Sequence, residues 1–167
     1  SPNYRLILQL AQKKAIEDNA HLVIVESDVV IQPATIQKLM LQAAKVKNPG
    51  LIAAVTTDET GEINFPYLFA RSYRKGTVET GKRLSFCCTL LTNRFLNAYN
   101  FENLDSEKTW YDIYISHKST KLGFKNYLLT NVPVLHLPHS SRPWKMLKYT
   151  NPLKYYWKKY TKGLDKI

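Results

Sequence analysis

The chain has 167 residues, 44% of them hydrophobic and 12% aromatic, which is enough apolar material for a folded domain and excludes a disordered or low-complexity chain. No stretch reaches the roughly 18 uncharged apolar residues that a membrane-spanning helix requires. The formal net charge of +11, from 24 Lys and Arg against 13 Asp and Glu, favours partners that carry phosphate, such as nucleic acid, nucleotides or anionic lipid.

The first 55 residues alternate helix and strand. Apolar spacing predicts a helix over Tyr4–Glu17 with Asn3 as its N-cap. The continuous apolar run His21–Val25 predicts a strand of the kind that is buried on both faces in a parallel sheet. A second helix after Pro33 and a buried strand at Leu51–Val55 continue the pattern, which is typical of an α/β fold. The residues that this second helix would turn inward are Ile36, Leu39, Met40 and Ala43.

Shorter elements are expected in the rest of the body. In chain order they are a loop with one short strand over Asp58–Tyr73, a strand over Arg83–Leu91, a short helix from Thr92 to near Tyr99, a helix that opens at Ser106 or Thr109 and ends at Gly123, and strands at Phe124–Leu129 and Val132–Leu135. The pattern begins on a helix, without a first strand or βαβ unit, and therefore resembles the later part of a larger domain.

The positive charge is concentrated at the C-terminal end. Eight basic residues and one acid lie between Arg142 and Ile167, whereas the preceding body is close to neutral. We therefore divide the chain into a body, residues 1–140, and a basic aromatic tail, residues 141–167. Bulky apolar and aromatic residues alternate with lysines in this tail, which favours contact with an anionic membrane surface. The alternative is a helix packed on its own domain, and Pro152 would interrupt any single long helix.

Two adjacent cysteines, Cys87 and Cys88, bear on the cellular compartment. A disulfide between neighbours would be strained, so both thiols are expected to be reduced and buried. This favours a cytoplasmic location, with the tail allowing peripheral attachment at the inner face of the plasma membrane.

Two carboxylates, Glu26 and Asp28, follow the first predicted strand with one residue between them. Ligands of α/β sheets bind beyond the carboxyl ends of the strands. A pair of carboxylates there could hold a divalent cation and, through it, a diphosphate. The alternative is that both side chains cap the turn after the strand, and on this tripeptide alone the turn is the commoner use.

Residues further along the chain favour the first interpretation. Asp112 is placed early on a predicted helix, Gly123 lies 11 residues later at its end, and His136 lies 13 residues after that at the end of a strand. In this order and spacing, together with Glu26 and Asp28, the sequence resembles the family 2 glycosyltransferases of the GT-A fold over residues 1–140. The resemblance implies an α/β fold with a GT-A-type, Rossmann-like mixed sheet flanked by helices, here without its N-terminal nucleotide-binding βαβ portion.

The same resemblance implies a metal-dependent inverting glycosyltransferase. Such an enzyme moves a sugar from a nucleotide-sugar donor to the hydroxyl of a saccharide or lipid-linked acceptor, in cell-surface polysaccharide or glycolipid synthesis. Glu26 and Asp28 would hold Mn²⁺ or Mg²⁺ on the donor diphosphate, and His136 would be a further metal or phosphate ligand. Asp112 would be the base that takes the acceptor proton. His139 is an alternative to His136.

The sequence also departs from the family pattern. Glu26 stands where the first Asp is customary, and Tyr111 stands where a Glu usually precedes the catalytic Asp. The Gln-x-x-Arg-Trp signature of processive synthases is absent from the sequence, which argues against a polymerase.

Two further residues are weaker candidates. Arg83 could contact phosphate or acceptor, and a solvated arginine is an equal alternative. Trp110 could stack on an acceptor sugar, whereas inward packing is the simpler role for an aromatic residue at a helix start.

The rival function is a non-catalytic, basic nucleic-acid-binding module. The near-neutral body argues against it, as does the lack of an RNP-type aromatic motif.

Overall fold

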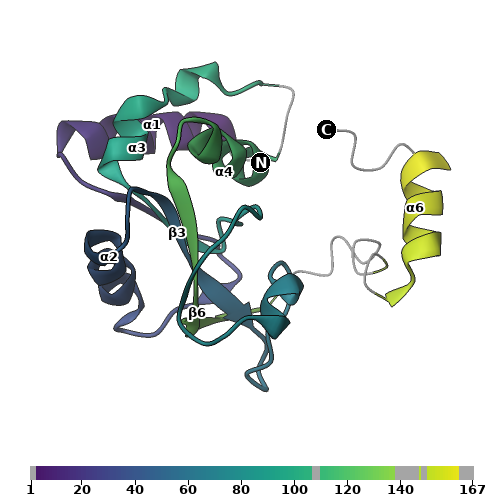
Figure 1. The fold of residues 1–167 in the computed structure, drawn as a ribbon. Coiled ribbons are helices and arrows are strands. Elements are labelled where there is room, and N and C mark those ends of the chain that lie inside the picture. Colours follow the sequence, from purple (N-terminus) through teal and green to yellow (C-terminus); the bar gives the residue numbers. More distant parts are fainter. Residues whose placement is uncertain (1–2, 107–109, 138–146, 148–149, 162–167) are drawn as a thin grey trace. The chain divides into compact units, whose positions relative to one another are not determined.

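The computed structural model describes residues 3–106, 110–137, 147 and 150–161. The chain divides into two compact units, Ser1–Leu137 and Pro138–Ile167, each of which is described by itself. Figure 1 shows the helices and strands of both units.

A mixed six-stranded sheet forms the centre of the first unit. Its strands follow the order β1-β5-β3-β6-β2, and β4 pairs with β6 beside this path. The central pair, β3 and β6, is parallel, whereas the other pairs are antiparallel. The strand bounds are β1 Leu22–Val25, β2 Val29–Val30, β3 Pro49–Thr57, β4 Thr77–Glu79, β5 Cys88–Leu91 and β6 Lys125–His136. The predicted α/β class with a mixed sheet flanked by helices is confirmed at this level.

A single turn joins the two ends of the strand path. β1 and β2 are the first and last strands of the path and do not pair with each other, yet they are consecutive in sequence and are joined by Glu26–Asp28. β2 pairs with the last residues of β6, Leu135 and His136. The turn that carries the candidate carboxylates therefore links the two end strands of the path.

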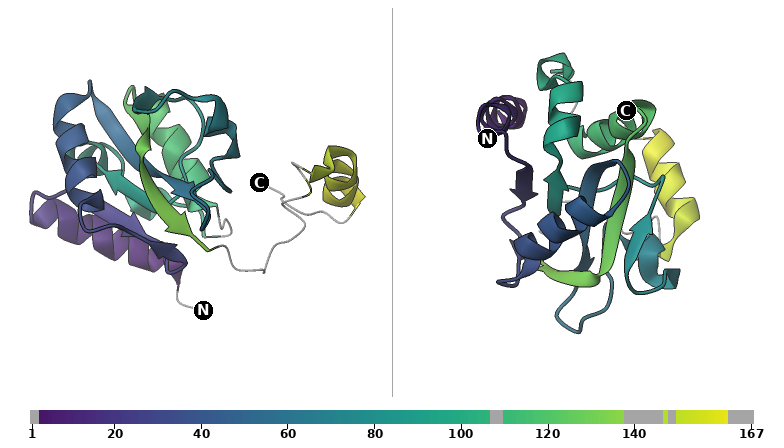
Figure 2. Two further views of the ribbon diagram at one scale, coloured as in Figure 1. Left: turned by 90° about the horizontal axis from the view of Figure 1, so that it is seen from below. Right: turned by 60° about the vertical axis from the view of Figure 1, so that its left-hand side comes forward.

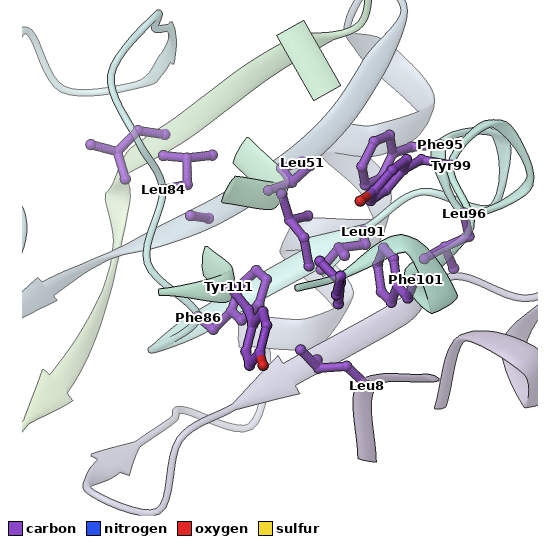
Figure 3. Close-up of a cluster of buried hydrophobic side chains, with 14 of the residues drawn as sticks. Leu8, Leu51, Leu84, Phe86, Leu91, Phe95, Leu96, Tyr99, Phe101 and Tyr111 are labelled. Atoms are coloured by element: carbon purple, nitrogen blue, oxygen red, sulfur yellow. The ribbon is translucent and has the colours of Figure 1, made fainter. Parts of the chain in front are cut away.

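Helices cover both faces of the sheet, as the views in Figures 1 and 2 show. The first face is covered by α1 (Tyr4–Glu17), α3 (Asn93–Ala98) and α4 (Tyr111–Lys121), and the second by α2 (Thr35–Lys45). Side chains of β3 alternate between two cores, because successive residues of a strand point to opposite faces. Leu51 belongs to the first core, shown in Figure 3, and Ile52 to the second.

Local signals set the helix ends that the sequence predicts. The side chain of Asn3 accepts a hydrogen bond from the backbone N–H of Leu6, and that of Thr92 caps α3 in the same way. Gly123 ends α4 with a φ of 83°, a conformation that favours glycine. The start of α4 was expected at Ser106 or Thr109 and is instead at Tyr111, with Trp110 at the N-cap position.

One side chain joins α1 to the segment that follows α3. The Nε2 atom of Gln12 donates to the carbonyls of Leu96, at 2.7 Å, and Tyr99, at 2.6 Å. Its Oε1 atom accepts from the backbone N–H of Phe101 at 2.7 Å, which opens the 3₁₀-helix Phe101–Asn103. Gln12 is only 4% exposed, so these bonds are shielded from water.

The expectation for the first strand was wrong in two respects. Leu22 and Ile24 pack on the first core and Val23 on the second, but all three are only half-buried. Nor is β1 an inner strand of a parallel sheet. It is an end strand, antiparallel to β5, and Val25 is 38% exposed.

The inward set predicted for the second helix was also wrong in part. Leu39 is fully buried, whereas Ile36 and Met40 are exposed. Among the described helices of the first unit, α2 is the one whose side chains join the second core, so within this unit no second helix covers the flank that carries Ile36 and Met40.

Three predicted strands differ from the observed ones. Residues 83–87 are not part of β5, because side chains bind their backbone: the N–H of Leu84 donates to Ser116 Oγ and that of Ser85 to the hydroxyl of Tyr67. The strands predicted on either side of residue 130 form one strand, β6. Pro133 is accommodated there beside a shift in the register with β3. The short strands β2 and β4 were not predicted.

The second unit contains helix α6, Pro152–Thr161. Asn151 begins it, because its side chain accepts from the backbone N–H of Lys154 at 3.0 Å, and proline suits the first helical position. No helix in the described part of the chain is long and apolar enough to cross a membrane.

Candidate functional site

The turn Glu26–Asp28 is bound to the sheet on both sides. The N–H of Glu26 donates to the carbonyl of Cys87, at the start of β5. The carbonyl of Asp28 accepts from the N–H of Leu137, just beyond β6. A third bond, from the N–H of Val29 to the carbonyl of Glu26, closes the turn. The two carboxylates thus leave the end of a strand, and their backbone is fixed.

The pairing of β2 with β6 places His136 beside Asp28. Val29 lies opposite His136 in this ladder. Atom Nε2 of His136 is 3.5 Å from Oδ2 of Asp28, and the imidazole is almost entirely buried. This distance is long for a direct hydrogen bond.

A second contact determines the tautomer of His136. Its Nδ1 atom lies 2.6 Å from the carbonyl oxygen of Phe65. A carbonyl oxygen can only accept, so Nδ1 carries a proton. Nε2 therefore faces the Asp28 carboxylate either as the second N–H of an imidazolium or as a lone pair that a cation could bind.

Glu26 lies in a less hydrated place than an ordinary surface carboxylate. Burial is the main cause that raises the pKa of Glu26, and the negative charges of Asp28 and Asp112 raise it further. The thiol of Cys87, which donates to Oε2 at 3.3 Å, and the nearby His136 act in the opposite direction. The charges of Asp28, Asp112 and His136 thus all act on the carboxyl group of Glu26.

Asp112, whose charge acts on Glu26, belongs to a different element. It lies in the first turn of α4, where the positive end of the helix dipole favours a carboxylate. Its charge also contributes to raising the pKa of Tyr4 and of the buried Tyr67, although burial is the larger cause for both. An ionised acid in this position could accept a proton from a bound hydroxyl.

A cleft of about 440 Å³ lies beside the carboxylates and is lined by Tyr4, Ile24, Val25, Glu26, Ser27 and Asp28. A larger hollow of about 540 Å³ lies between α1 and the segment from α3 to residue 102. None of Glu26, Asp28, Asp112 or His136 lines this larger hollow. Glu26 and Asp28 line the smaller cleft, whereas Asp112 and His136 are not among its lining residues. We therefore assign the carboxylate pair, and not all four candidate residues, to the smaller cleft.

The weaker candidates, Arg83 and Trp110, do not line the cleft beside the carboxylates. Arg83 is half-buried and precedes Leu84, whose backbone is bound to Ser116, one turn of α4 beyond Asp112. Trp110 is half-buried at the N-cap of α4, two residues before Asp112. His139 lies outside the described residues.

Three residues at the site were not predicted from the sequence. Tyr4 lines the cleft, and Cys87, expected to be a simple core residue, donates to Glu26. Tyr67 donates to the carbonyl of Ser85 and accepts from its N–H, which fixes the chain next to Cys87. The pairing of Val25 with Cys88 explains the position of Cys87, but this pairing has no local sequence signal.

A divalent cation at this turn would need several oxygen or nitrogen ligands. Within the described residues, no group of three or more His, Cys, Asp and Glu side chains is arranged to hold a metal ion. Asp28 and Nε2 of His136 nevertheless provide two suitable ligands, and Nδ1 of His136 is oriented by a carbonyl as in metal-binding histidines. Mg²⁺ is commonly held by one or two carboxylates and completed by substrate phosphate oxygens. Asp28 and His136 thus supply two donors, and a cation at this turn would need oxygens from a substrate to complete its ligands.

The two cysteines give a first testable prediction. Burial raises the pKa of Cys87 and raises the pKa of Cys88 to about 11. Because the thiolate is the reactive form, both should react with Ellman's reagent at pH 8 about 10²-fold more slowly in the folded chain than in urea. The rate for Cys88 should continue to rise up to about pH 11. Rapid release of the chromophore from the folded chain at pH 8 would contradict the buried placement.

Comparison with known proteins bears on the fold. No protein-family model matches the chain, and no curated protein sequence matches it. Among solved structures, the chain is similar to A197 from STIV, with a TM-score of 0.58 and 12% sequence identity over 83% of this chain and 70% of that one. At this identity the likeness establishes a shared α/β fold and nothing further.

Proposed function

We propose that this chain belongs to an inverting glycosyltransferase of the GT-A type, which moves a sugar from a nucleotide-sugar donor to an acceptor hydroxyl. The acceptor in this proposal is a saccharide or lipid-linked sugar of cell-surface polysaccharide or glycolipid synthesis. The location that accompanies this proposal is the cytoplasmic side of the membrane.

The observation that supports the proposal is the position of Asp28, in the turn that follows a strand, beside His136. Glu26 and Asp28 come from the β1–β2 turn, Asp112 from the start of α4 and His136 from the end of β6. Asp28 and His136 are in contact, and the charge of Asp112 reaches Glu26. The order and spacing of these residues are those that resemble the family 2 glycosyltransferases.

In this proposal the acids divide into two roles. Asp28, Glu26 and His136 would bind the diphosphate end of the donor through a divalent cation, Mn²⁺ or Mg²⁺. When bound, such a cation neutralises the charge of the departing nucleoside diphosphate. The thiol of Cys87 would hold the Glu26 carboxylate in position through its hydrogen bond.

Asp112 would accept the proton of the acceptor hydroxyl as that oxygen attacks the anomeric carbon. One base and one direct displacement invert the configuration at that carbon, by the logic that applies to inverting glycosidases. Arg83 and Trp110 remain candidates for contact with phosphate or acceptor.

In this proposal the base of the donor nucleotide is bound by a portion of the GT-A domain other than the strands described above. Within the described strands, β1 pairs with β5 alone, so its other edge is open. A βαβ portion of the nucleotide-binding kind could add a strand at this edge. The open edge supports the expectation that a GT-A domain extends beyond the described strands.

Calorimetric titration with Mn²⁺ and a nucleoside diphosphate tests the proposal on the protein that carries the nucleotide-binding portion together with this chain. Asp28→Ala should weaken binding by about tenfold or more, and Glu26→Ala should weaken it less. Asp18→Ala is the matched control, because Asp18 is an exposed acid that pairs with Lys14 on α1. Unchanged binding in Asp28→Ala, with the fold verified by circular dichroism, would remove the diphosphate site from this turn.

A further inference from the structure

Helix α6 presents its apolar residues to solvent. Leu153, Trp157 and Tyr160 are 87%, 71% and 77% exposed, and Tyr156 is exposed as well. At about 100° per residue these four side chains share one stripe of the helix. We name this stripe the α6 stripe.

The α6 stripe lies opposite the side chain that anchors the helix. Tyr155 is buried, and the helical angle places it on the side away from Leu153 and Tyr160. A surface helix of a globular protein normally turns its apolar stripe towards the core. In α6 the buried side chain is Tyr155 and the wider apolar stripe is exposed, so the stripe is available to a partner outside the second unit.

The charges around the stripe define the chemistry of that partner. Lys154 lies on one flank of the stripe and Lys159 on the other, whereas Lys158 lies nearer to Tyr155; the helix contains no acidic residue. Trp and Tyr favour the headgroup region of a membrane, and lysines beside them attract anionic lipid. With 10 residues the helix is too short to span a bilayer, which requires roughly 20.

We propose that α6 binds in the plane of an anionic membrane surface, with the α6 stripe inserted between headgroups and its lysines at the level of the lipid phosphates. Nucleic acid fits less well, because phosphate contacts would engage the lysines and leave Leu153 in water. The proposed contact is a property of α6 itself and does not depend on sugar transfer.

Co-sedimentation of the full chain with vesicles tests this inference. The chain should pellet with phosphatidylcholine vesicles that contain phosphatidylglycerol, and should remain in solution with phosphatidylcholine alone. Leu153→Ser combined with Trp157→Ser should lower the partition coefficient by about tenfold or more. Leu10→Ser is the matched control, because Leu10 is an exposed apolar residue of α1, 59% exposed, and its loss should leave the partition coefficient unchanged.

The lysines give a second arm to the experiment. Lys154→Gln and Lys159→Gln should each lower binding to the anionic vesicles by about fivefold, and Lys158→Gln should lower it less, because Lys158 lies nearer to Tyr155. In addition, 0.5 M NaCl should weaken binding of the unaltered chain. Recovery in the supernatant with both kinds of vesicle would overturn the inference. So would equal binding by the Leu153/Trp157 variant, or tighter binding to a single-stranded oligonucleotide than to the anionic vesicles.

Discussion

Replacing Asp112 by asparagine should lower the rate of sugar transfer by about 10²-fold or more, because it removes the proposed base while keeping the size of the side chain. Asp112 lies in the first turn of α4, and asparagine is compatible with that position. The circular dichroism spectrum of the Asn variant should therefore match that of the unaltered chain.

Release of nucleoside diphosphate from a panel of nucleotide sugars measures this effect. Asp18→Asn provides the control, since it alters an exposed acid of α1 whose ion pair with Lys14 contributes little to stability. A rate in Asp112→Asn equal to that of the control would exclude Asp112 as the base. Asp105 and Glu107, the other acids near this helix, would then be the next candidates.

Replacing Gln12 by leucine should lower the free energy of unfolding by about 3 kcal/mol or more. The leucine fills a similar volume but leaves the carbonyls of Leu96 and Tyr99 and the N–H of Phe101 without their present partner. Each buried polar group that loses its hydrogen bond costs about 1–3 kcal/mol. Urea denaturation followed by circular dichroism measures the change.

Gln9→Leu is the matched control for this prediction. Gln9 lies on the same helix and donates one bond, to the carbonyl of Phe101, from a more exposed position. Its loss should cost about 1 kcal/mol or less. Equal midpoints for the two variants would show that the three bonds of Gln12 do not hold α1 to the first core.

The parts of the fold that follow from the sequence are those with local causes. Helix α1 and the short α3 are predictable because the residues that cap them, Asn3 and Thr92, precede them directly. The pairing of β1 is not predictable in this way. A continuous apolar run indicates that side chains pack on both faces, but the partner of β1 is β5, more than 60 residues further along the chain.

The same distinction applies to the candidate site. The sequence places Asp112 at a helix start and His136 at a strand end, and the structure has both there. It does not reveal Cys87 as the hydrogen-bond partner of Glu26, because the two are 61 residues apart. It also gives no sign that Tyr4 lines the cleft, since this depends on how α1 packs over β1. The catalytic and metal-binding roles remain predictions.

The turn Glu26–Asp28 also connects the two end strands of the path, β1 and β2. Each of these strands pairs with the rest of the sheet through a short ladder. The β1–β5 ladder has four residue pairs and the β2–β6 ladder has two. Short ladders at the ends of a sheet are where local opening costs least, and such opening can occur while the core stays folded. A ligand that engaged both carboxylates would bind only the closed arrangement and would raise the free energy of opening at both ladders together. A ligand bound at this turn would therefore reduce local opening in β1 and β2 together, although these two strands lie at opposite ends of the path.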